Sequence, residues 1–245
     1  MNPPSHPTRR DLFRLAALGG LAGSVEDVRT YDHALPAAAI AAAAGLATSR
    51  VAAYSFDAAD ASLTLSGGAA LGGGGFSGSA LVLNGSTGFA TAARLVDTAA
   101  SFSVSAWVRL AATSNFATVA GQDGAQASGF CLQYSAADDA WAFAMVAADT
   151  ANAAATRAVS PFPPRADGWT HLVGVRDASA GRLRLYVDGV LVADAAAGPA
   201  WGAGGAFTIG RGKWNGGDAD HFPGRVDQVK VWTRALTDAD VQAIA

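Results

Sequence analysis

Short runs in which apolar and polar residues alternate recur about every ten residues from residue 50 to the end of the chain. The run 102–110 places an apolar residue at every second position, which is the pattern of a half-buried β-strand. The run 182–187 ends at Asp188-Gly189, a dipeptide that supplies the positive φ angles of a tight hairpin turn. Helical periodicity of useful length appears only at 237–244. The pattern predicts an all-β fold of antiparallel strands, and periodicity alone leaves a sandwich and a barrel both open.

Composition excludes several classes of protein. Hydrophobic residues make up 51% of the 245 residues, charged residues only 15%, and there are 29 glycines, which indicates a turn-rich globular domain rather than a disordered chain. The net charge is −3 and the basic residues are scattered, so we expect no nucleic-acid partner. Beyond the first 25 residues no segment is long and apolar enough for a membrane helix, so we expect no stable membrane insertion of the mature domain.

The chain has a single cysteine, Cys131. One cysteine excludes an intrachain disulfide and any zinc cluster built on cysteines. It lies in an apparent strand, residues 129–134, where a buried thiol acts as a small apolar side chain. We therefore expect Cys131 to be buried and unreactive.

The first residues have the pattern of an export signal. Residues 8–14, Thr-Arg-Arg-Asp-Leu-Phe-Arg, resemble the twin-arginine export motif, and the uncharged stretch 15–25 has the length of the apolar part of a signal peptide. We predict that residues 1–22 are a twin-arginine-like export signal. The protein is then secreted or extracytoplasmic.

The two ends of the chain resemble each other. Residues 23–42, GSVEDVRTYDHALPAAAIAA, align without a gap with residues 224–243, GRVDQVKVWTRALTDADVQA. In the second copy Thr237 is an expected helix N-cap with Asp240 three residues later. We interpret 23–45 as the remnant of the last strand and helix of an upstream repeat, left by a deletion or by a misjoined gene model. This segment should be loosely attached and add little to the core of a domain formed by residues 50–245.

Motifs across the body of the chain resemble one known family. They are residues 54–57 (Tyr-Ser-Phe-Asp), 83–85 (Leu-Asn-Gly), 103–108, 168–173, 185–189 and the closing segment 222–232. In this order they are similar to a laminin-G-like domain of the concanavalin A-like lectin and glucanase superfamily. The resemblance implies a two-sheet antiparallel jelly-roll sandwich with a short C-terminal helix. It also implies that Trp107, Trp169 and Trp232 occupy core positions.

The catalytic groups of related glucanases are missing from the chain. Those enzymes carry carboxylates in an E-x-D-x-E pattern on one strand, because retaining hydrolysis needs two carboxyl groups about 5 Å apart. The only glutamate is Glu26, in the remnant, and no strand carries an equivalent series of aspartates. No G-x-S-x-G motif is present to position a nucleophilic serine. We predict that the protein is not an enzyme.

The resemblance also implies a Ca²⁺ ion at one rim of the sandwich. It points to Asp57 after the first strand and Asp227 in the last strand, and Asp60 is the one further carboxylate in the segment that follows Asp57. Ca²⁺ takes six to eight oxygen ligands, so carbonyls and water would complete the site. The alternative is that these are surface carboxylates at strand ends.

Ligand contact is expected on the glycine-rich loop 211–221. Its candidate ligand-binding residues combine an apolar ring with hydrogen-bonding groups, as a sugar requires, and are Trp214, Asn215, Asp218, Asp220 and His221. The alternative is a hairpin whose tryptophan only covers the end of a sheet.

These observations predict an exported, non-catalytic module that binds carbohydrate or serves in adhesion, with a glycan or a cell-surface or extracellular partner. Ca²⁺ is the expected stabilising ion. The alternative is a structural spacer repeat of a multi-domain surface protein, without a small-ligand site. An exposed Trp214 beside a polar pocket would favour the first function, and a buried Trp214 the second. The identity of the ligand and the oligomeric state stay open at this point.

Overall fold

The computed structural model describes residues 44–165 and 168–245. The predicted export signal and all but the last two residues of segment 23–45 lie outside the described residues. The regular elements are β1 (Arg50–Tyr54), β2 (Thr64–Ser66), β3 (Ala70–Gly73), β4 (Ser79–Asn84), β5 (Phe89–Ala92), β6 (Phe102–Leu110), β7 (Ala117–Asp123), β8 (Ser128–Ser135), β9 (Ala140–Val146), β10 (Ala155–Val159), β11 (Thr170–Asp177), β12 (Arg182–Val187), β13 (Val190–Ala196), β14 (Phe207–Ile209), β15 (Gly212–Trp214), β16 (Gly217–Ala219), β17 (Pro223–Trp232) and α2 (Asp238–Ile244).

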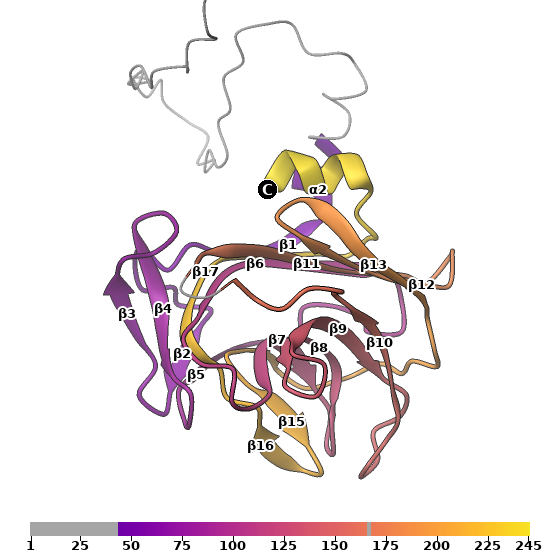
Figure 1. Cartoon of the computed structure of the whole chain (residues 1–245), viewed down its shortest axis with the longest axis horizontal. Coiled ribbons are helices and arrows are strands. Elements are labelled where there is room, and N and C mark those ends of the chain that lie inside the picture. Colours follow the sequence, from indigo (N-terminus) through magenta and orange to yellow (C-terminus); the bar gives the residue numbers. More distant parts are fainter. Residues whose placement is uncertain (1–43, 166–167) are drawn as a thin grey trace, which may run out of the picture. The chain divides into compact units, whose positions relative to one another are not determined.

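Two antiparallel sheets lie face to face and form a sandwich (Figure 1). Within the described residues, the first sheet has the order β13-β12-β11-β6-β17-β4-β3, and β1 pairs with the second half of β17. The second sheet has the order β10-β9-β8-β7-β14-β5-β2. In both orders a run of consecutive strands is followed by strands from distant parts of the chain, as in a jelly roll. The structure thus confirms the predicted all-β sandwich over a barrel.

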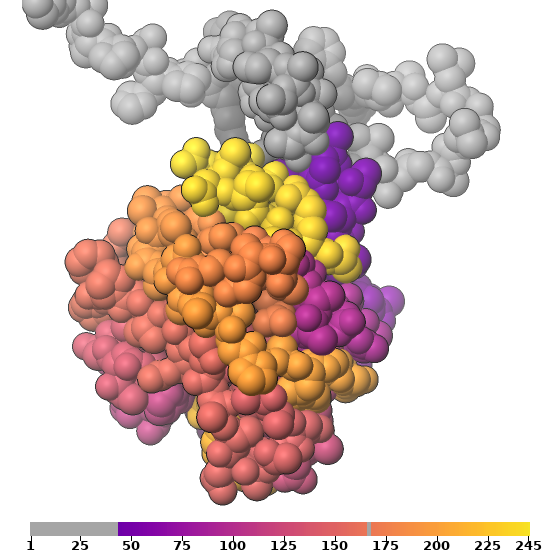
Figure 2. Space-filling view, turned by 90° about the vertical axis from the view of Figure 1, so that its right-hand side faces the viewer, coloured from indigo at the N-terminus to yellow at the C-terminus, as the bar shows by residue number. Residues whose placement is uncertain are grey.

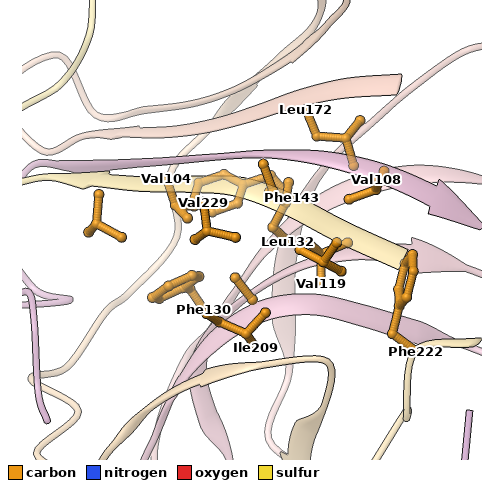
Figure 3. Close-up of a cluster of buried hydrophobic side chains, with 14 of the residues drawn as sticks. Val104, Val108, Val119, Phe130, Leu132, Phe143, Leu172, Ile209, Phe222 and Val229 are labelled. Carbon is orange, nitrogen blue, oxygen red and sulfur yellow. The ribbon is translucent and has the colours of Figure 1, made fainter. Parts of the chain in front are cut away.

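The core lies between the two sheets and is built by the predicted alternation (Figure 3). On β6, Val104 and Val108 point inward and are fully buried. They meet Phe130 and Leu132 of β8 from the opposite sheet. Because successive side chains of a strand point to opposite faces, the intervening residues Ser103, Ser105, Trp107 and Arg109 lie on the outer surface of the first sheet.

The turn predicted at Asp188-Gly189 is confirmed. The two residues have φ angles of 49° and 79° and connect β12 to β13, with Val187 paired to Val190. Positive φ at both central positions is what a two-residue hairpin of this kind requires, and it matches the right-handed twist of the strands.

The predicted C-terminal helix is also confirmed, as α2. The Thr237 side chain accepts a hydrogen bond from the backbone N–H of Asp240, and Oδ2 of Asp240 accepts one from the backbone N–H of Thr237 at 2.8 Å. This reciprocal capping box satisfies N–H groups that the first helical turn leaves unpaired. Of the helices in the described part of the chain, none has the length and apolar character that a membrane span requires.

A second apolar cluster covers the outer surface of the first sheet. Its members come from β11, β12, β17, the segment between β17 and α2, α2 and the helical residues 44–49, and are Leu46, Val173, Val175, Tyr186, Trp232, Leu236 and Val241. The indole N–H of Trp232 donates to the carbonyl of Leu46 at 3.1 Å. Residues of α2 (yellow) and of the segment from residue 44 (indigo) lie side by side in Figure 2. The packed domain therefore includes residues 44–49, ahead of the boundary expected at residue 50.

Two tryptophans differ from the expectation that they occupy the core. Trp107 and Trp169 are half-buried and neither belongs to the core cluster between the sheets. Trp107 is one of the residues of β6 whose side chains point away from the core, because it lies an odd number of positions from the buried Val104 and Val108. Trp232 is buried as expected, but in the second cluster, whereas Trp141 is the tryptophan in the main core.

Candidate functional site

The loop 211–221 forms a hairpin of β15 and β16 that packs on the outer surface of the second sheet (Figure 1). The carbonyl of Asp220 accepts from the backbone N–H of Thr118 at 2.7 Å, and Ser128 Oγ accepts from the backbone N–H of Lys213 at 2.9 Å. These bonds join the hairpin to β7 and β8. The expected ligand loop is therefore a fixed part of the sandwich.

At the tip of the hairpin, Trp214 is 40% exposed, whereas the side-chain amide of the neighbouring Asn215 is already hydrogen-bonded within the protein. Asn215 Oδ1 accepts from the backbone N–H of Asn152 at 2.7 Å, and Asn215 Nδ2 donates to Asn152 Oδ1 at 3.0 Å. The amide thus ties the hairpin to the loop after β9. Trp214 is left as an accessible stacking surface.

Asp218 belongs to a charged network centred on Arg211. Its carboxylate lies 3.2 Å from Nε of Arg211. The same guanidinium pairs with Asp123 at 2.9 Å, where both side chains are almost completely buried, and stacks over the ring of Phe89 at 4.7 Å. A paired and hydrogen-bonded arrangement is what a buried charge requires. The network fixes the base of the hairpin to β7.

Of the last two predicted ligand residues, Asp220 lies near the buried cysteine, and the His221 ring lies 6.2 Å from the ring of Phe89. Burial raises the pKa of Asp220, and nearby His221 partly opposes this rise. Burial, followed by the charge of Asp220, raises the pKa of Cys131 to about 12. The structure confirms the expected burial of Cys131, and a thiol with so high a pKa is almost entirely un-ionised at neutral pH, as an unreactive cysteine would be.

Two of the three predicted metal ligands meet at one loop. Asp57 Oδ1 accepts from the backbone N–H of Ser79 at 2.9 Å, and Asp227 Oδ2 accepts from the backbone N–H of Ser77 at 3.0 Å. Both carboxylates thus hold the loop between β3 and β4. Asp60 instead bonds its own turn, because its Oδ1 accepts from the backbone and the hydroxyl of Ser62.

A β-bulge sets the direction of Asp227. Gln228 has a φ of 48°, and the pairing of β17 with β6 shifts register between Asp227 and Lys230. The extra residue lets both Asp227 and Lys230 face outward although they are three positions apart. Burial raises the pKa of Asp227, backbone N–H groups oppose the rise, and the charge of Asp57 adds to it.

The donor set suits Ca²⁺ in chemistry but is incomplete in number. Asp57 and Asp227 offer hard oxygen ligands, and their mutual repulsion is what a cation would relieve. Three of their four carboxylate oxygens already accept a backbone N–H, and the described residues contain no group of three metal-ligating side chains. Backbone carbonyls and water would have to supply most of the six to eight oxygens that Ca²⁺ takes.

Asp227→Asn tests this electrostatic arrangement. A folded-state pKa above the ordinary value of 3.8 means that ionised Asp227 opposes folding at neutral pH, and that this penalty disappears as the pH falls through the folded-state pKa. The difference in free energy of unfolding between wild type and Asp227→Asn should therefore move in favour of the wild type on acidification. Denaturant titrations at neutral pH and at about pH 4.5, without divalent cations, measure this difference.

Asp60→Asn is the matched control. Hydrogen bonds from the Ser62 hydroxyl and then its backbone N–H lower the pKa of Asp60, so its contribution to stability is lost, not gained, as the pH falls. That loss begins only below the ordinary pKa of 3.8, so between neutral pH and about pH 4.5 the free-energy difference between wild type and Asp60→Asn should stay nearly constant. An equal shift in both variants over this range would contradict the assignment for Asp227.

Two cavities lie near these carboxylates. The larger, of about 470 Å³, is lined by the loop 53–61 together with Leu63, Leu65 and Leu71. The smaller, of about 200 Å³, opens on the outer surface of the first sheet. We call the smaller one the outer-face pocket; it is lined by Phe76, Ser77, Ser105, Trp107, His171, Gln228, Lys230, Ile244 and Ala245. Neither cavity is lined by a residue of the hairpin 211–221.

An aromatic stack borders the outer-face pocket. Phe76 lies parallel to Trp107 with ring centroids 3.5 Å apart, and His171 stacks on Trp107 at 5.0 Å. Burial, and next the charge of Lys230, lowers the pKa of His171 to about 4, so the imidazole is neutral at physiological pH. The family resemblance led us to expect Trp107 in the core, and no sequence pattern singled out Phe76. The available signal was the outward parity of Trp107 on β6.

Comparison with known proteins places this arrangement in context. Residues 83–242 match the family Laminin_G_3, described as the concanavalin A-like lectin/glucanases superfamily. No curated protein sequence matches the chain.

Among solved structures, domain 4 of AbnA, an extracellular arabinanase from Geobacillus stearothermophilus in complex with arabinotriose, is similar with a TM-score of 0.63. The two are 24% identical over 80% of this chain and 98% of that one.

The botulinum neurotoxin type G receptor binding domain has a TM-score of 0.60 and 12% identity, over 80% of this chain and 50% of that one. A structure of botulinum neurotoxin type C, whose cell entry depends on interaction with two ganglioside molecules, has a TM-score of 0.61 and 12% identity over 82% and 52%. This chain thus spans about half the length of these toxin structures. At such identities the similarities concern the fold.

Proposed function

Because the chain belongs to the concanavalin A-like lectin/glucanases superfamily, we propose that it is a non-catalytic module that binds carbohydrate or serves in adhesion. The observation that carries this proposal is the exposed Trp214 ring at the tip of a rigidly anchored hairpin. An indole held in place by the scaffold stacks on the apolar face of a sugar at little cost in conformational entropy. Asn215, Asp218, Asp220 and His221 complete the proposed ligand surface.

The structural relatives are consistent with a ligand of this class. The arabinanase domain was solved with arabinotriose, and the type C neurotoxin interacts with gangliosides. Because arabinotriose is uncharged, a neutral oligosaccharide is our first choice of ligand, and the proposed partner is a glycan on an extracellular or cell surface. We further propose that residues 1–22 direct export by a twin-arginine route, which would bring the domain to such partners.

The alternative function, a spacer repeat without a small-ligand site, also has an observation in its favour. The polar groups of the hairpin engage other parts of the protein: Asn215 contacts Asn152, and Asp218 contacts Arg211. A hairpin that only caps the sheet would use its polar groups in this way. Trp214 is exposed, but neither cavity described above includes a residue of the hairpin, so the criterion of an exposed Trp214 beside a polar pocket is met only in its first half.

A glycan-binding experiment tests the proposal. We expect the purified full chain to bind neutral oligosaccharides on a glycan array that includes arabinotriose, without turnover of the bound sugar. Trp214→Ala should reduce binding by roughly tenfold, the loss of one stacked aromatic ring in a well-ordered contact. Isothermal titration with the strongest array ligand measures the change in Kd.

Val190→Ala is the matched control, since Val190 is also exposed on a hairpin turn, at 63%. It should leave the Kd unchanged. An array without any bound glycan would count against carbohydrate binding. Equal Kd values for wild type and Trp214→Ala would remove the hairpin from the proposed site.

We retain Ca²⁺ as a proposed stabilising ion at Asp57 and Asp227. If it binds, its charge favours the ionised carboxylates, and the metal raises the melting temperature of the wild type by mass action. The titrations of Asp227→Asn repeated with added Ca²⁺ should then show a gain in the wild type only. A melting temperature of the wild type that does not depend on Ca²⁺ would remove the metal from the proposal.

A further inference from the structure

Two residues that line the outer-face pocket carry buried polar atoms that have no hydrogen-bond partner among the described residues. They are Ser105 Oγ and His171 Nδ1, on residues that are 1% and 2% exposed. Ser105 lies on β6 and His171 on the neighbouring strand β11, both facing outward. Buried polar groups in native proteins are nearly always paired, and an unpaired one costs stability. Two such groups on one pocket wall are what a polar molecule entering the pocket would satisfy.

The size of the pocket limits what that partner can be. Its volume of about 200 Å³ equals that of roughly six to seven liquid water molecules, which is the size of a single sugar ring. The pocket is open to the surface and is bordered by α2 through Ile244. A single ring at the end of a chain could enter, and the rest of a glycan could extend into solvent.

The walls of the pocket match such a ring in chemistry. The Trp107 and Phe76 rings supply an apolar border, while Ser105 and neutral His171 supply groups that can each donate or accept a hydrogen bond. Sugar sites combine an aromatic surface with a few positioned polar groups in this manner.

Phe76 is held at the pocket mouth by Asp227. The backbone N–H groups of Ser77 and Phe76 both face the Asp227 carboxylate, with the Ser77 bond at 3.0 Å. A side chain added at the neighbouring Gly75 would come within 2.3 Å of the backbone carbonyl oxygen of Ser79 and within 2.8 Å of the same carboxylate, so this position of the loop requires glycine. Asp227 is thereby a positioning residue for the aromatic border.

We propose that the outer-face pocket is a second carbohydrate site, distinct from the hairpin, which receives one neutral sugar ring at the end of a glycan. Ser105 and His171 bind its hydroxyl groups, and Trp107 and Phe76 contact its apolar face. The class of ligand, a carbohydrate, is taken from the proposed function, and the rest of the inference does not depend on it. Its location on the opposite sheet makes it separately testable.

The experiment uses the full chain and a panel of methyl glycosides of arabinose, galactose, glucose and mannose as probes. We expect at least one of them to shift the side-chain NMR signals of His171 and of the Trp107 indole, with saturation in a titration. Ser105→Ala should weaken that binding by about fivefold, as expected for one lost neutral hydrogen bond. Because the Ser105 hydroxyl has no partner, its removal should leave the melting temperature unchanged or higher.

Ser103→Ala is the matched control on the same strand and the same face. The Ser103 hydroxyl donates to the carbonyl of Arg234 at 2.9 Å and accepts from the backbone N–H of Leu236 at 3.0 Å. Its removal should lower the melting temperature and leave sugar binding intact, the reverse of Ser105→Ala. Signals of His171 and Trp107 that do not move with any probe would overturn the inference and indicate a pocket filled by water.

The two proposals can fail separately. Array binding that is lost in Trp214→Ala and unaffected in Ser105→Ala, with no shift at His171, would overturn the pocket and leave the proposed function standing. Saturable shifts at His171 that Ser105→Ala weakens would support the pocket even if the array detects no longer glycan.

Discussion

Arg211→Met is expected to destabilise the protein by about 3 to 5 kcal/mol, because it leaves the Asp123 carboxylate buried without its partner. For a domain of this length the melting temperature should fall by roughly 10 °C. Methionine has a similar reach and no charge, so the change isolates the loss of the ion pair. Thermal unfolding followed by circular dichroism measures it.

The reason for so large an effect is the position of the guanidinium. Arg211 and Asp123 are 7% and 6% exposed, so water cannot replace the lost bonds. In the described residues, one other cation is paired with the same carboxylate: Lys213, at 3.7 Å. At this longer distance it does not replace the contacts of Arg211. The hairpin that carries Trp214 begins at this ion pair, and its loosening should also reduce sugar binding by the hairpin.

Two further variants make the prediction falsifiable. Arg157→Met breaks an ion pair with Asp138 whose side chains are 36% and 29% exposed, and it should cost less than about 1 kcal/mol. The double variant Arg211→Met with Asp123→Leu should recover much of the loss, since a buried pair replaced by apolar residues is often tolerated. A single Arg211→Met variant as stable as Arg157→Met would contradict the buried network.

Trp232→Ala is expected to cost about 3 to 5 kcal/mol, the usual range for deletion of a fully buried aromatic side chain. The side chain lies under α2 and donates its indole N–H to the carbonyl of Leu46, so its loss also frees residues 44–49. Leu46→Ala should cost about 2 kcal/mol by itself. Urea denaturation gives both free energies of unfolding.

Leu191→Ala is the control for Leu46→Ala, because Leu191 is 40% exposed and its truncation should change stability by only about 0.5 kcal/mol. If Leu46→Ala is equally mild, then residues 44–49 lie loosely on the domain, as the sequence interpretation of the neighbouring segment 23–45 would have it. The structure leads us to expect the larger effect.

Local patterns accounted for most of the fold. The alternation in 102–110 depends on nothing beyond the geometry of a strand, and the structure places its apolar half in the core. Asp188-Gly189 and the Thr237–Asp240 cap are likewise interactions within a few residues, so the sequence carries their complete signal. Strand parity alone would also have placed Trp107 outside, and the resemblance to a family pattern led to the wrong side.

The sites depend on contacts that no local pattern encodes. Asp227 meets Ser77 across 150 positions of the chain, and Arg211 meets Asp123 across 88, so only the register of the sheets brings them together. Residue type alone was enough to select the carboxylates and the tryptophan of the hairpin as candidates. It could not predict that the polar groups of the hairpin already bond to other parts of the protein. The outer-face pocket exists because β6 and β11 are neighbours and a glycine-rich loop brings Phe76 over Trp107. Sequence thus determined the strands, turns and cap through short-range geometry, and tertiary pairing decided which polar groups were left free to bind a ligand.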